Sequence, residues 1–112
     1  EDIVHAFRSR FPELSFVATS LQQSDQQLKL GMWHNDQWHT FSHRMIKQQF
    51  GGTGDVFASY FCKAHFFEGQ SPTRSMEWAA LQTLNCLDFT LSKHSPYLEI
   101  YPASAKSHNK NI

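Results

Sequence analysis

The sequence has few cysteines, no net charge and no long apolar run. Its 112 residues include two cysteines, and 10 basic side chains balance 10 acidic ones. Two cysteines are too few for a disulfide framework, and a neutral chain has no field that would steer it to nucleic acid or an anionic membrane. No stretch resembles a membrane span or a secretory signal. We therefore expect no nucleic-acid or membrane partner, a cytoplasmic location, and reduced, buried thiols at Cys62 and Cys86.

The length suits one domain, because 112 residues are too few for two well-packed cores. We therefore treat residues 1–112 as a single unit, with a polar tail over about 103–112. The chain opens with no initiator methionine, already inside an amphipathic pattern. We expect it to be a piece of a larger protein.

The first half of the chain predicts a helix, a strand and a hairpin. Apolar residues recur at helical spacing over 2–11, and Pro12 stops the run. The apolar run at 14–21 is typical of a central, parallel-type strand buried on both faces. Two further runs flank Asn35 and Asp36, a pair that favours a tight turn, so they predict a β-hairpin.

The second half predicts two helices and a short strand. A broad apolar face over 55–68 indicates a helix that ends at Gly69. Ser71 and Pro72 are typical of an N-cap and first turn, and the helix they begin closes near Lys93. The segment "YLEIYP" alternates like a last strand. The order of elements indicates the α/β class.

The segment "GGTGD" (51–55) stands where a loop meets a helix. Backbone N–H groups there can converge on one point, and the helix dipole makes that point attractive to an anion such as phosphate. Asp55 would repel a resting phosphate unless it holds or deprotonates a hydroxyl, which is the layout of phosphoryl transfer to an alcohol. The alternative is structural: Asp55 caps the helix and the glycines form a turn. The residues alone leave these two interpretations about equal; the segment matches neither a Walker A motif nor GxGxxG.

The wider context of this segment resembles one enzyme family. "FGGTGDVFASYF" is similar to the GTGD signature of the ribokinase-like kinases, and "FVATSL" is similar to the strand ending in Thr-Ser of the pyridoxal kinases. The hairpin, "HRMIKQQFGGTGD", "GQSPTRSMEWAAL" and "YLEIYPASAK" follow in that family's order and cover nearly the whole chain. The resemblance implies the C-terminal, ATP-side portion of a ribokinase-like, Rossmann-like three-layer α/β/α fold, with a β-hairpin before the GTGD loop.

The resemblance also implies roles for individual residues. Asp55 matches the catalytic base that activates the 5′-hydroxymethyl group of pyridoxal, pyridoxine or pyridoxamine, with ATP and Mg²⁺ as cofactors. The other matched positions are the anion hole for the γ-phosphate (Gly52, Thr53, Gly54), the contacts to the ATP phosphates (Thr19, Ser20) and the nucleotide pocket (Phe50). No metal ligand is implied in this chain, and a homodimer is compatible with the family.

The family's N-terminal part, which supplies most of the parallel sheet and most of the vitamin-binding residues, has no counterpart in this sequence. We therefore do not expect phosphoryl transfer from these residues alone, and we expect strand 14–21 to have an unpaired edge that makes the isolated chain associate. A sharp monomer in sedimentation would contradict this. Three alternatives stay open: another small-alcohol kinase of the same fold for hydroxymethylpyrimidine or a sugar, a non-catalytic nucleotide-binding fragment, and a structural domain with an Asp-capped helix.

Two further groups of residues have simpler explanations. His34, His39 and His43 suggest a metal site, but His39 and His43 are four residues apart on one strand, too far for easy joint ligation at about 3.3 Å per residue. Trp33 and Trp38 flank the hairpin turn and predict a cross-strand pair.

Overall fold

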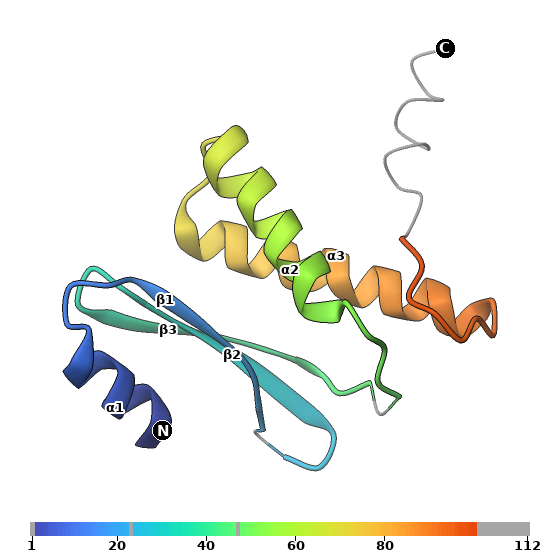
Figure 1. The fold of residues 1–112 in the computed structure, drawn as a ribbon, viewed down its shortest axis with the longest axis horizontal. Helices are drawn as coiled ribbons and strands as arrows, with labels where there is room; N and C mark the ends of the chain where they lie inside the picture. The colour runs from blue at the N-terminus through green and yellow to red at the C-terminus, as the bar shows by residue number, and fades with distance from the viewer. Residues whose placement is uncertain (1, 23, 47, 101–112) are drawn as a thin grey trace.

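The structure is a computed structural model that describes residues 2–22, 24–46 and 48–100. These residues form a mixed α/β arrangement with one antiparallel sheet in the order β1-β2-β3. Within the described ranges, no helix combines the length and apolarity needed to cross a membrane. The elements are α1 (Asp2–Arg10), β1 (Phe16–Gln22), β2 (Gln27–His34), β3 (Gln37–Arg44), α2 (Thr53–Cys62), the π-helical turn η1 (Lys63–Phe67) and α3 (Pro72–Ser92) (Figure 1).

The predicted hairpin is confirmed, and its turn explains the pairing. Asn35 and Asp36 both have positive φ, 53° and 58°, the backbone that a two-residue type I′ turn requires. This turn sets the β2–β3 register, in which Trp33 pairs with Trp38 as expected. The Asn-Asp dipeptide therefore places the two tryptophans opposite each other.

The strand predicted at 14–21 exists, but its predicted environment is wrong. β1 pairs antiparallel with β2, Val17 opposite Met32, and it lies at the edge of the sheet. It is not a parallel strand buried on both faces: Thr19 and Ser20 are exposed. An apolar run marks a strand, but it does not state which partner the strand will find. Among the described residues, β1 pairs with β2 alone, so its other edge agrees with the unpaired edge expected from the sequence.

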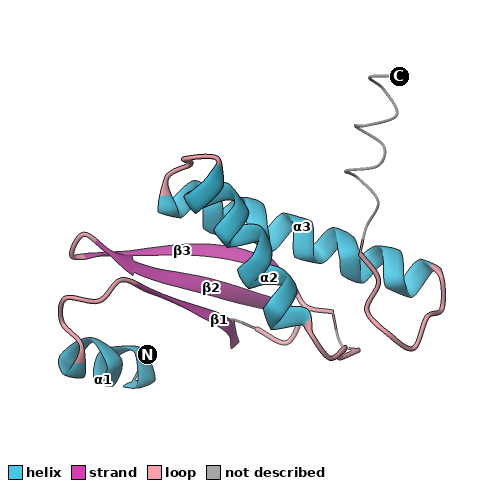
Figure 2. Ribbon diagram, turned by 45° about the horizontal axis from the view of Figure 1, so that its top comes forward, coloured by secondary structure: helices cyan, strands magenta, loops and turns pink. Residues whose placement is uncertain are grey.

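The core lies between the sheet and the pair α2 and α3. Leu30 and Met32 of β2 point to the same face because side chains alternate along a strand, and they pack against Met76 and Ala80 of α3. Partly buried residues complete this cluster: Val17, Phe41, Phe57 and Phe61. Figures 1 and 2 show α2 and α3 side by side over this one face of the sheet.

The opposite face of the sheet carries the aromatic residues near the hairpin turn and is contacted by α1. The Arg8 guanidinium lies 3.5 Å from the centre of the Trp33 ring, and Phe7 packs on Phe16 with ring centroids 4.6 Å apart. The Trp38 ring fills the space beside Gly31 on β2, where a Cβ atom would overlap it. Gly31 is therefore needed for the Trp38 ring to lie flat on the sheet.

We expect Gly31→Ala to lower the free energy of unfolding by about 1–3 kcal/mol, because the new methyl group forces the Trp38 ring out of its place. Urea unfolding of the two proteins measures this. Gly51→Ala is the matched control, since a Cβ there meets no atom within 4 Å. Equal stabilities for the two variants would show that Trp38 repacks without cost.

The two predicted helices after the glycine segment are confirmed, with a different start for the first. α2 begins at Thr53, η1 continues it, and Gly69 with φ 70° ends the run as predicted. Ser71 caps α3: its Oγ accepts a hydrogen bond from the Arg74 N–H at 3.2 Å, and Pro72 opens the helix. Local signals at both ends were therefore sufficient to define α3.

The packing of α2 against α3 determines which of the two cysteines is buried. The Tyr60 ring meets Trp78 edge to face at 5.4 Å, and the Tyr60 hydroxyl lies 3.6 Å from Cys86 Sγ. Burial and this contact raise the pKa of Tyr60 to about 12. Cys86 is buried as predicted, but Cys62 is exposed, so its predicted burial is wrong. The face of α2 that meets the core carries Phe57 and Phe61, and Cys62 lies off that face.

The predicted last strand is not formed over the residues that the structure describes. Residues 97–100 have no strand pairing; the Glu99 N–H instead donates to Thr90 Oγ1 on α3 at 2.8 Å. The Thr90 hydroxyl of α3 therefore accepts the hydrogen bond from a backbone N–H group that would otherwise need a partner on a neighbouring strand. Tyr101, Pro102 and the polar tail lie outside the described residues.

Candidate functional site

The start of α2 is built by the glycine segment. Gly52 is the N-cap, and its φ of 89° lies in the left-handed region that favours glycine. No side chain caps the helix; the Thr53 hydroxyl turns back and donates to the Phe50 carbonyl at 2.8 Å. The first-turn N–H groups of α2 therefore have no side-chain partner in the described part of the chain, which leaves them for an anion.

Asp55 is not the helix cap. It is the third residue of α2 and it is exposed, and within the described residues its carboxylate accepts no hydrogen bond. Its backbone carbonyl accepts a hydrogen bond from the Ser59 hydroxyl at 2.8 Å, as an ordinary helical residue can. The interpretation of Asp55 as an N-cap is wrong, because the left-handed Gly52 begins the helix three residues earlier.

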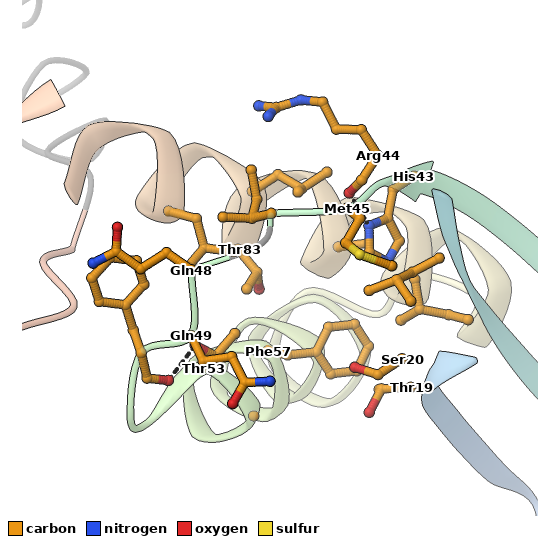
Figure 3. A pocket seen from close by; sticks show the side chains of 18 residues that line it. Thr19, Ser20, His43, Arg44, Met45, Gln48, Gln49, Thr53, Phe57 and Thr83 are labelled. Atoms are coloured by element: carbon orange, nitrogen blue, oxygen red, sulfur yellow. Dashed lines mark hydrogen bonds between the residues drawn. The ribbon is translucent and has the colours of Figure 1, made fainter. Parts of the chain in front are cut away.

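A cavity of about 490 Å³ opens in front of this helix start, between the end of the sheet and α3 (Figure 3). Five of the seven residues predicted to form the site line it: Thr19, Ser20, Phe50, Thr53 and Gly54. The other two, Gly52 and Asp55, do not line it but flank Thr53 and Gly54 in the chain. The structure thus brings together two segments more than 25 residues apart. The size is that of a small-molecule site.

A bulge in β1 explains how Thr19 and Ser20 both reach the cavity. On a regular strand consecutive side chains point to opposite faces, so only one of them could face the helices. The register shifts between Ala18 and Leu21, and Ser20 has a positive φ of 59°. β1 therefore contributes one extra residue there, and both hydroxyls lie at the same end of the cavity (Figure 3).

Glycine at position 54 has no structural requirement. A positive φ explains Gly52, but Gly54 is helical, and a Cβ there would meet no atom within 4 Å. Because Gly54 lines the cavity, the missing side chain leaves open space next to the first turn of α2. Such space lets a ligand approach the backbone closely. The residues therefore fit a phosphate group.

Most of the remaining wall is apolar, and the sequence did not indicate it. Its apolar members come from β2, the loop after β3, α2 and α3: Leu28, Leu30, Met45, Ile46, Phe57, Ala80, Leu84 and Leu87. Five polar residues of the wall were also missed as site residues: His43, Arg44, Gln48, Gln49 and Thr83. Gln48 and Gln49 directly precede Phe50, which was the available signal; Thr83 lies within α3 and had no such signal beside it.

A metal site is not formed by the histidines. Among the residues that the structure describes, no group of three or more His, Cys, Asp or Glu side chains could hold a metal ion. His34 Nδ1 instead lies 2.9 Å from the Ser15 hydroxyl, and His43 Nδ1 lies 2.9 Å from the Arg44 carbonyl. None of the described residues that line the cavity carries a carboxylate.

Comparison with protein-family models and with curated protein sequences finds no match to this chain.

Proposed function

We propose that this chain forms the ATP-side part of a ribokinase-like kinase that phosphorylates the 5′-hydroxymethyl group of pyridoxal, pyridoxine or pyridoxamine. The observation that carries the proposal is the convergence of Thr19, Ser20, Phe50, Thr53 and Gly54 on one cavity at an uncapped helix start. These residues were assigned to nucleotide binding from the resemblance alone, and an accidental resemblance gives no reason for them to line the same cavity. The proposed fold requires further parallel strands beside β1, whose outer edge has no strand partner among the described residues.

The residues have distinct tasks in this proposal. ATP supplies the γ-phosphoryl group, accompanied by Mg²⁺. The N–H groups at Gly52, Thr53 and Gly54 bind the transferring group and stabilise the charge that develops on it. Thr19 and Ser20 bind the other phosphates, and Phe50 contributes to the apolar wall around the nucleoside.

Asp55 is the proposed general base. Asp55 follows Gly54 directly and is not among the residues of the cavity wall, and its exposed carboxylate is accessible to an alcohol. The carboxylate takes the hydroxyl proton as the alcohol oxygen bonds to phosphorus, and the bond from phosphorus to ADP breaks. A carboxylate on the acceptor side distinguishes this proposal from a binding module, which needs none.

MgATP is expected to raise the melting temperature of the longest native chain that contains this segment. At a hundredfold excess over Kd the stabilisation is about 2.7 kcal/mol, which corresponds to several degrees in Tm. The same protein is then assayed with pyridoxal, pyridoxine, pyridoxamine and hydroxymethylpyrimidine. No stabilisation would leave only the structural-domain alternative, whereas stabilisation with transfer to hydroxymethylpyrimidine alone would select a different alcohol kinase.

A further inference from the structure

The polar side chains of the cavity wall are largely committed to the protein itself. The Thr83 hydroxyl donates to the Ala79 carbonyl within α3 at 2.7 Å, and Arg44 forms an ion pair with Asp88. His43 Nδ1 lies 2.9 Å from the Arg44 carbonyl, which can only accept, so this nitrogen carries the proton. Thr83 Oγ1 and the other His43 nitrogen keep lone pairs for a ligand, whereas the Arg44 guanidinium keeps N–H donors on an exposed side chain. An acceptor of this kind can take a hydrogen bond from the amino group of adenine or from that of guanine, so it does not distinguish the two bases.

Apart from Thr19, Ser20 and Thr53, which the proposed function places at the phosphates, the other polar side chains of the described wall are Gln48 and Gln49. Gln48 and Gln49 are exposed and lie on the loop between β3 and α2 (Figure 3). A terminal amide carries both a donor and an acceptor, and rotation exchanges their positions. It can therefore pair with the N6 amino group and N1 of adenine or with O6 and N1–H of guanine.

Strong discrimination between similar ligands needs a fixed, buried polar group that the wrong ligand leaves unpaired. Among the described residues of the wall, Thr83 is the one buried polar side chain, and because its hydroxyl proton is given to Ala79 it offers either base the same acceptor. The rest of the buried wall is apolar, and the adaptable polar groups are exposed. We propose that this cavity binds purine nucleoside triphosphates with little preference for the base, so that MgGTP replaces MgATP as phosphoryl donor. The inference rests on the proposed function, because it assumes that the cavity holds a nucleotide.

The experiment measures Kd for MgATP and MgGTP on the longest native chain, with ligand-dependent melting as a second readout. We expect the two Kd values to lie within about tenfold of each other, the range that an apolar pocket without fixed polar readout allows. MgATP binding more than tenfold tighter than MgGTP would overturn the inference and leave the proposed function standing. Binding of neither nucleotide would overturn both.

A pair of threonine variants tests the assignment of Thr83. Thr83 and Thr90 both donate to the carbonyl four residues earlier in α3, each at 2.7 Å, but only Thr83 lines the cavity. We expect Thr83→Val to change both Kd values by the same factor, so that their ratio stays within about threefold of the parent's, and Thr90→Val to leave the ratio unchanged. A larger change of the ratio in Thr83→Val alone would show that this hydroxyl reads the base, contrary to the inference.

Discussion

Asp55→Asn is expected to reduce phosphorylation of the B6 vitamers by about 10²–10⁴-fold, the usual contribution of a general base. The carboxamide keeps the size of the side chain but cannot take the proton of the alcohol. MgATP affinity should be kept, because Asp55 does not line the cavity. Steady-state kinetics and nucleotide titration of the same preparation measure both quantities.

Asp36→Asn is the matched control for the loss of one carboxylate. Asp36 is exposed in the hairpin turn with φ 58°, a conformation that asparagine also adopts readily. Its turnover should equal that of the parent protein. Turnover of Asp55→Asn within a fewfold of the parent would remove Asp55 from the role of base, and a parallel loss of MgATP binding would place it in the nucleotide site instead.

Gly54→Ala is expected to change stability and nucleotide affinity in opposite directions. Gly54 is helical with open space at its Cβ position, so alanine should stabilise α2 by roughly 0.5–1 kcal/mol. The same methyl group intrudes on the cavity next to the first-turn N–H groups. An overpacking cost of about 1–3 kcal/mol in the complex would weaken MgATP binding roughly tenfold to hundredfold. Gly54→Val should weaken it further.

Chemical unfolding and MgATP titration of Gly54→Ala measure the two effects. Gly69→Ala provides the converse control, because its φ of 70° strains alanine by about 1–2 kcal/mol at a position outside the cavity. That variant should lose stability and keep its affinity for MgATP. Parent-like MgATP affinity in both Gly54 variants would show that the backbone at this position does not contact phosphate.

The sequence predicted the elements whose signals are local. Asn35 and Asp36 specify the turn by their own backbone preferences, and Ser71 with Pro72 specifies the start of α3. The partner of β1 could not be predicted, because an apolar run fits any strand and pairing depends on residues elsewhere in the chain. The strand predicted at 97–100 was wrong for the same reason. Its alternation of residues suits a strand, but the Glu99 N–H binds the Thr90 hydroxyl and not a neighbouring strand.

In the candidate site, too, the part with local sequence signals was predicted and the part assembled from distant segments was not. The glycine motif was sufficient to predict a junction between a loop and a helix at 51–55, but the helix begins at Thr53, two residues before the predicted start. The apolar wall was not predicted, because it is assembled from β2, the 45–50 loop and α3, which meet only after folding. The helix is capped by Gly52 and not by Asp55, because a glycine in the left-handed conformation can begin a helix without a side-chain hydrogen bond.

The extra residue in β1 affects how this chain should be compared with others or redesigned. Up to Ala18 the strand alternates regularly, and from Leu21 onward the register to β2 has changed by one residue. An alignment without a gap to a regular strand would assign every later position to the wrong face of the sheet. A design that removes Ser20 would restore regular pairing and relieve a left-handed residue, yet it would withdraw a hydroxyl from the cavity. The extra residue in β1 therefore serves the wall of the cavity and costs the sheet one step of regular pairing.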